Sequence, residues 1–188
     1  MRKPRKLEKD VFYHVTARIN RGEMAMKNQT MRSLFIEFLI IVKKKFSFSI
    51  SSFCVMNNHI HLVIRPKYED ELPKIMQWLL GNYAKAWNKA HGVKGHLWGD
   101  RYFSKIIENI HAFLKVFDYV CKNPLKANLV KRIEDWKDSG IAHFLAQKRE
   151  LLDVPICIEP IYKAYCRLLE RGEAFDFNLD SFLIVCNS

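Results

Sequence analysis

Residues 54–64 read CVMNNHIHLVI, an apolar run broken first by an Asn-Asn pair and then by two histidines. The Asn-Asn pair lies between two segments rich in β-branched residues, which predicts a β-hairpin over residues 47–66. Because side chains alternate across a strand, the apolar residues of the second strand share one face, and His59 and His61 share the other. The stretch therefore predicts a sheet with one apolar face and one face that carries two imidazoles.

The segments around this hairpin alternate between strand and helix signals. β-branched and aromatic residues predict strands in residues 11–19 and within residues 97–107. Apolar residues at helical spacing predict helices over residues 30–45, 71–90 and 110–122, the last stopping at Asn123-Pro124. The order β-α-β-β-α-β predicts an α+β fold, a ferredoxin-like split unit whose antiparallel sheet carries helices on one face. The helix over residues 110–122 and a C-terminal extension complete the expected fold.

The length and composition of the chain are sufficient for a hydrophobic core. It has 188 residues, of which 49% are hydrophobic. We expect residues 1–145 to form one domain and residues 146–188 to form an extension of unknown role. No apolar run reaches the length of a membrane span, so we expect no membrane partner. The five cysteines are scattered without a CxxC spacing, which favours reduced thiols in a cytoplasmic protein.

The net charge of +11 indicates what kind of partner the protein can bind. One interpretation is a basic, solvated surface that binds nothing acidic. The sharper interpretation is a polyanion partner, because neutralising phosphates releases their condensed counterions.

The two histidines are candidate metal ligands. Imidazoles at positions i and i+2 of a strand are close enough to share one divalent ion. The alternative is a pair of polar residues on the open face of a sheet, because two ligands do not make a site. A metal site therefore needs a third ligand from elsewhere in the chain.

The helix over residues 110–122 offers that ligand at its C-terminal end. Tyr119 lies about 110° from the apolar stripe of this helix, at 100° per residue, among lysines. Asn123 follows one turn later, where the helix dipole favours a cation. One helix can thus present a phenol and an amide oxygen to the same point. The alternative for Tyr119 is a packing residue with a solvated hydroxyl.

Four segments together resemble the Y1 transposases of the IS200/IS605 type, and most of all the REP-associated tyrosine transposases. They are VMNNHIHLVI with its His-hydrophobic-His (HUH) motif, FYHVTARINRG, GHLWGDRYFS and DYVCKNPLKANLV. They occur in the order of the family and cover residues 10–140. Three departures are Asn57, where the family often has proline, Cys121-Lys122, where an acidic or polar pair is more usual, and Asn128, where glycine is common.

The resemblance implies a metal-dependent transposase that cuts and rejoins single-stranded DNA carrying hairpins. It implies that His59, His61 and Asn123 hold Mg²⁺ or Mn²⁺, and that Tyr119 is the nucleophile that forms a 5′-phosphotyrosine link. It also implies a monomer or homodimer in the cytoplasm of a bacterium, at the nucleoid.

Basic and aromatic residues supply candidate DNA contacts. The basic candidates are Arg18, Arg21, Lys85, Lys89, Arg101, Lys105, Lys115 and Lys122. Of these, Lys115 and Lys122 can either lower the pKa of Tyr119 or bind phosphate. Trp98, Tyr102 and Phe103 are candidates to stack bases, and we expect at least two of the three to pack in the core instead.

Two other functions remain open from the sequence. A domesticated protein that binds hairpin DNA without cutting it would keep the fold, although the four candidate site residues are intact. A small-molecule metallohydrolase would use the His-x-His pair, but would need further Asp or His ligands close to the site.

Overall fold

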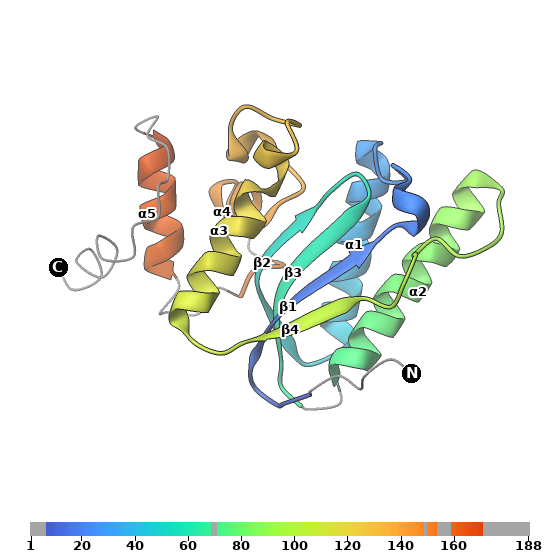
Figure 1. Ribbon diagram of the computed structural model, residues 1–188, viewed down its shortest axis with the longest axis horizontal. Helices are drawn as coiled ribbons and strands as arrows, with labels where there is room; N and C mark the ends of the chain where they lie inside the picture. The colour runs from blue at the N-terminus through green and yellow to red at the C-terminus, as the bar shows by residue number, and fades with distance from the viewer. Residues whose placement is uncertain (1–6, 69–70, 149, 154–158, 171–188) are drawn as a thin grey trace.

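A four-stranded antiparallel sheet forms the centre of the fold in the computed structural model, which describes residues 7–68, 71–148, 150–153 and 159–170. The strand order is β2-β3-β1-β4 (Figure 1). The strands are β1 (Phe12–Arg18), β2 (Phe48–Val55), β3 (His59–Pro66) and β4 (Phe103–Ile107). The α+β fold with this sheet is the one that the sequence predicted, and the structure confirms it.

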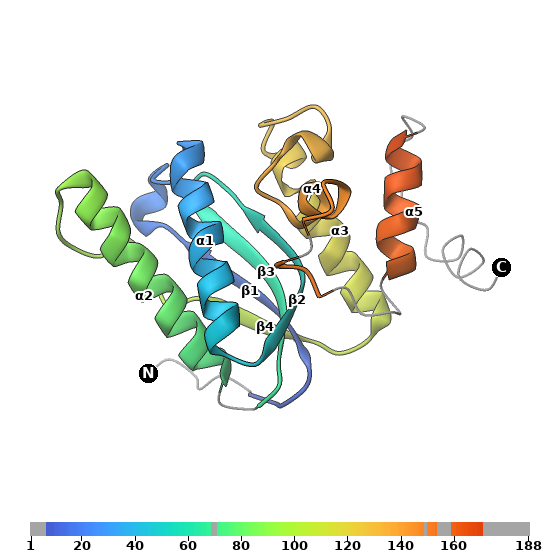
Figure 2. The same cartoon turned by 180° about the vertical axis from the view of Figure 1, so that it is seen from behind.

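Helices α1 (Gln29–Lys45) and α2 (Glu71–His91) cover one face of the sheet; Figure 2 shows α1 in front of it. Asn28 begins α1, because its side chain accepts a hydrogen bond from the Thr30 amide. Alternate strand residues point to these helices and form the larger core with them. Its members include Val15, Phe35, Leu39, Leu62, Ile64, Leu79 and Tyr83.

Helix α3 (Ile110–Lys126) lies on the opposite side of the sheet from α1, as Figures 1 and 2 show together. A second, smaller core joins α3 to the sheet and to α4 (Gly140–Leu145), which the sequence did not predict. Its members include Cys54, Val63, Phe113, Phe117, Val120 and Ile141. The sheet therefore has a fully covered face and a partly covered face.

Helix α5 (Glu159–Glu170) belongs to the expected C-terminal extension and packs on the second core. The Tyr162 ring lies 4.8 Å from the Phe117 ring, and its hydroxyl donates to the Ser51 carbonyl at 2.6 Å. Residues 154–158 and 171–188 of this extension lie outside the described residues. The boundary at residue 145 stays a prediction.

The end of α3 corrects the sequence-based boundary. The helix continues past Pro124 to Lys126, one turn beyond the predicted end at Lys122. A proline in the last turn removes one amide donor, but the capping residue Ala127 still donates to the Asn123 carbonyl. The chain leaves the helix at Asn128, whose φ of 54° lies in the left-handed region. Asparagine tolerates this conformation better than most residues.

The described helices include none that is long and apolar enough to cross a membrane.

Candidate functional site

Neighbouring strands β1 and β3 place a group of polar side chains on the face of the sheet that α3 partly covers. Thr16 pairs with His61 in the antiparallel register, and Arg18 pairs with His59. Thr16 Oγ1 and His14 Nε2 each lie 3.0 Å from His61 Nδ1. Two side chains of the neighbouring strand β1 therefore hold the His61 ring through its Nδ1 atom.

Helix α3 brings Tyr119 over this group. The apolar stripe of α3, which includes Phe113, Phe117 and Val120, is buried. Tyr119 lies outside this stripe and is 40% exposed. The Tyr119 ring nevertheless meets two imidazoles edge-on, with centroid distances of 5.3 Å to His61 and 6.0 Å to His14. The phenol thus has one side against the imidazoles and the other open to solvent.

Asn123 lies one turn after Tyr119, between the imidazoles of the His-x-His pair. Its Oδ1 is 3.2 Å from His59 Nε2, and its Nδ2 is 3.2 Å from His61 Nε2. The structure therefore brings together the four residues His59, His61, Tyr119 and Asn123. Their assigned roles in metal binding and catalysis stay predictions.

The orientation of His59 is set by the turn that precedes it. Asn58 donates through Nδ2 to the Gly22 carbonyl, so its Oδ1 faces His59 Nδ1 at 2.7 Å. A hydrogen bond there requires the proton of His59 on Nδ1, which leaves the lone pair on Nε2. That lone pair faces Asn123 Oδ1, which is also an acceptor, so both atoms can bind the same cation.

Burial keeps the three imidazoles of the site neutral. It lowers the pKa of His61 to about 3, with further lowering from His59, His14 and Arg18. Burial also lowers the pKa of His14, and that of His59, to which Arg18 adds. A neutral imidazole is the form that binds a metal ion.

The donor set fits a divalent cation. Two Nε2 atoms and the Oδ1 atom of Asn123 converge, and both Nδ1 atoms have polar partners that orient the rings. Among the described residues, no cluster of three or more His, Cys, Asp or Glu side chains can hold a metal. A cation at this point would therefore depend on two imidazoles and an amide, with water or phosphate oxygens completing the coordination.

The predicted DNA-binding residues divide between the two faces. Arg18 pairs with His59, and Lys105 pairs with His14, so both share the face of the site. Arg21, in the short turn η1 (Asn20–Gly22), and Arg101, before β4, are both exposed.

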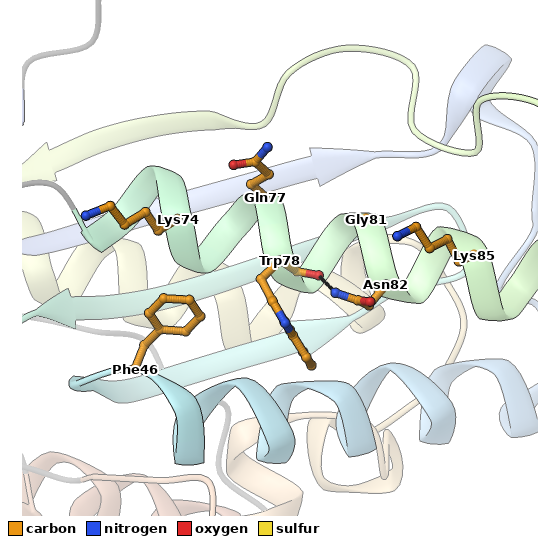
Figure 3. Close-up of a pocket in the computed structure, with 7 residues that line it drawn as sticks. All are labelled: Phe46, Lys74, Gln77, Trp78, Gly81, Asn82 and Lys85. Carbon is orange, nitrogen blue, oxygen red and sulfur yellow. Dashed lines mark hydrogen bonds between the residues drawn. The ribbon is translucent and has the colours of Figure 1, made fainter.

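Lys85 and Lys89 are exposed on α2, across the sheet from the imidazoles. Lys85 lines a shallow groove between α2 and the end of α1, with Lys74 and Trp78 (Figure 3). These two predicted contacts are therefore not part of the same surface as Tyr119.

The roles predicted for the α3 lysines Lys115 and Lys122 stay predictions. Lys115 is exposed one turn before Tyr119, whereas Lys122 forms an ion pair with Asp118 at 2.9 Å. A further lysine, not among the predicted contacts, lies at the phenol ring: the Lys126 ammonium is 5.3 Å from the ring centroid of Tyr119. The predicted helix ended at Lys122, so it did not include Lys126, which belongs to the last turn of α3.

His14 and Thr16 were also missed. Strand alternation alone separates them from Tyr13 and Val15, which are buried in the larger core. The alternation is visible in residues 11–19. It does not show that His14 and Thr16 meet His61, because the neighbouring strand is far away in the sequence.

Comparison with known proteins finds one matching family and similar solved structures. The family model described as "Transposase IS200 like" matches residues 8–123, more than half of the chain. A solved REP-associated tyrosine transposase bound to a REP hairpin is similar, with a TM-score of 0.65 and 24% identity, over 82% of this chain and 89% of that one. A candidate transposase from Deinococcus radiodurans R1 has a TM-score of 0.46 and 17% identity, over 64% of this chain and 95% of that one. No curated protein matches the chain. On the family match, this chain belongs to the IS200-like transposase family.

Proposed function

We propose that this protein cleaves and rejoins single-stranded DNA at hairpin-forming sites through a covalent bond between Tyr119 and a 5′ phosphate. One observation carries the proposal: the half-exposed Tyr119 ring rests against His61, beside the point where His59, His61 and Asn123 converge. A phenol in this position can reach a phosphate that approaches from solvent while the imidazoles hold its other side.

The proposed step is a transesterification. The Tyr119 oxygen forms a bond to phosphorus as the bond between phosphorus and the 3′ oxygen breaks. The phenol gives up its proton and the leaving oxygen takes one up, which yields a 5′-phosphotyrosine and a free 3′-hydroxyl. Because the phosphodiester energy is kept in the covalent link, another 3′-hydroxyl can reverse the step and join strands.

His59, His61 and Asn123 would hold Mg²⁺ or Mn²⁺ in this reaction. Bound there, the ion would polarise an oxygen of the scissile phosphate. The chain itself keeps the imidazoles neutral by burial and fixes His59 through Asn58. Lys126 beside the Tyr119 ring supplies a positive charge where the phenolate forms.

Single-stranded DNA with a hairpin is the proposed substrate. The family membership and the net charge of +11 support a DNA partner, and the similar solved protein is bound to a REP hairpin. Arg18 and Lys105 lie on the same face as the imidazoles, where they can neutralise phosphates on either side of the scissile one.

The test is covalent capture with single-stranded hairpin oligonucleotides and Mg²⁺ or Mn²⁺. Wild type should give a denaturant-resistant adduct that keeps the DNA 3′ of the cut, and peptide mapping should place it on Tyr119. Tyr119→Phe should bind the same DNA with similar affinity and give no adduct.

Two results would contradict the proposal. An adduct on Tyr83 or Tyr102, both buried, would mean a different nucleophile. Hairpin binding by wild type without adduct or cleavage, in either metal, would instead support the non-cleaving DNA-binding protein.

A further inference from the structure

Phe103 is the most exposed large apolar side chain among the described residues, at 62%. It begins β4, the strand at one edge of the sheet. Its register partner is Thr16, which in turn pairs with His61. Phe103, Thr16 and His61 therefore form one row across three strands, on the face where Tyr119 lies.

The surroundings of this ring are polar. Lys105 is two residues further along β4 and so on the same face, opposite His14. Thr16 and Arg18 continue that face on β1. Protein-binding surfaces are marked by contiguous apolar patches, whereas an aromatic ring among cations is typical of single-stranded nucleic-acid binding.

The other two aromatic candidates are used inside the fold. The Trp98 indole donates to the Leu80 carbonyl at 2.9 Å, and its ring packs against Tyr83. Tyr102 is only 9% exposed. Of Trp98, Tyr102 and Phe103, only Phe103 is thus exposed.

We propose that Phe103 is a stacking subsite for a nucleobase of single-stranded DNA about three nucleotides from the scissile phosphate, and that Lys105 binds the backbone beside it. The position of that phosphate rests on the proposed function. Two strand spacings of about 4.8 Å put the Phe103 backbone about 10 Å from that of His61. This is about three nucleotides at a rise of about 3.4 Å per nucleotide.

The experiment separates stacking from charge by using two probes with the same phosphates. Short oligo(dT) and an abasic chain of equal length are titrated against the full-length protein at one low salt concentration, with fluorescence anisotropy as the readout. Phe103→Ala should weaken oligo(dT) binding by about 5- to 150-fold and leave abasic binding unchanged. Phe103→Trp should restore oligo(dT) binding, and Lys105→Ala should weaken both probes.

Ile41→Ala is the matched control, because Ile41 is an exposed apolar residue on α1, outside the face of the site. It should leave both affinities unchanged. The proposal would be overturned if Phe103→Ala weakened binding of both probes equally, or weakened binding of neither. A fall in molecular mass of Phe103→Ala on size-exclusion chromatography with unchanged oligo(dT) binding would also overturn it, since the ring would then contact a second copy of the chain.

Covalent capture distinguishes this inference from the proposed function. At saturating hairpin DNA, Ile41→Ala should form as much adduct on Tyr119 as wild type, because Ile41 lies on α1, outside the face of the site. A different result is that wild type forms no adduct, while Phe103→Ala weakens binding of oligo(dT) but not of the abasic chain. In that case the cleavage proposal fails and the stacking subsite stands.

Discussion

The two faces of the sheet are built from the same strands but carry different kinds of side chain. On the face under α1 and α2, the side chains of β1 and β3 are apolar and fully buried, as Val15 and Leu62 are. On the other face, the alternate residues of the same strands include His14, Thr16, His59 and His61, beside the apolar Phe12 and Val63 of the second core. The apolar face needs only packing, whereas the polar face needs specific partners for each nitrogen. We infer that stability resides mainly in the first face and chemistry in the second.

The largest effect that tests this division compares two phenylalanines. Phe35 is fully buried in the larger core between α1 and the sheet, and Phe103 is exposed on the other face. Phe35→Ala should lower the free energy of unfolding by about 3–5 kcal/mol, because it removes buried area and leaves a cavity. Phe103→Ala should lower it by less than about 1 kcal/mol. Urea unfolding monitored by circular dichroism measures both.

Equal losses in the two variants would contradict the division of the faces. A large loss in Phe103→Ala alone would mean that the ring is covered by another part of the chain or by a second copy.

Much of this division follows from local sequence. Alternation in residues 59–66 places the imidazoles opposite the apolar side chains, and the strand β3 has the predicted bounds, His59–Pro66. Helical spacing likewise places Tyr119 away from the stripe of α3. These features depend on neighbours within one element, so the sequence alone predicts them.

The partners across elements could not be predicted in the same way. His14 and His61 meet because β1 and β3 are neighbours, although the two histidines are 47 positions apart in the sequence. Arg32 was not expected inside the core, yet its Nε donates to Asp138 Oδ2 at 2.6 Å, 106 positions away. Its Nη1 also donates to the side chain of Asn57, in the turn before His59. Such pairs depend on the tertiary arrangement, which local periodicity does not contain.

A pH effect of intermediate size sharpens the comparison from the polar face. The folded-state pKa of His61 is lowered to about 3, whereas an unfolded histidine titrates near 6.5. Between these values the unfolded chain binds more protons, so acid favours unfolding and stability falls as the pH drops below about 6.5. From pH 7 to pH 5, His61 alone should cost about 2 kcal/mol.

Urea unfolding in EDTA at both pH values measures this effect. The loss between pH 7 and pH 5 should be about 2 kcal/mol smaller in His61→Gln than in wild type. His96→Gln, at an exposed position, is the control and should lose as much as wild type. A loss in His61→Gln that equals the wild-type loss would show that this imidazole is not buried in its neutral form.

The smallest expected effect on stability compares two tyrosines, one on each face. The Tyr83 hydroxyl donates to the Met31 carbonyl at 3.2 Å inside the larger core, and burial raises the pKa of this phenol. Tyr83→Phe should cost about 1 kcal/mol, the net value of one hydrogen bond, and should leave covalent capture of hairpin DNA intact. Tyr119→Phe should change stability by less than about 0.5 kcal/mol and abolish capture, because the ring and its contacts remain but the attacking oxygen is gone. Thermal unfolding and adduct yield on the same two preparations decide the matter. If Tyr83→Phe loses the adduct while Tyr119→Phe keeps it, the face that carries the chemistry has been assigned wrongly.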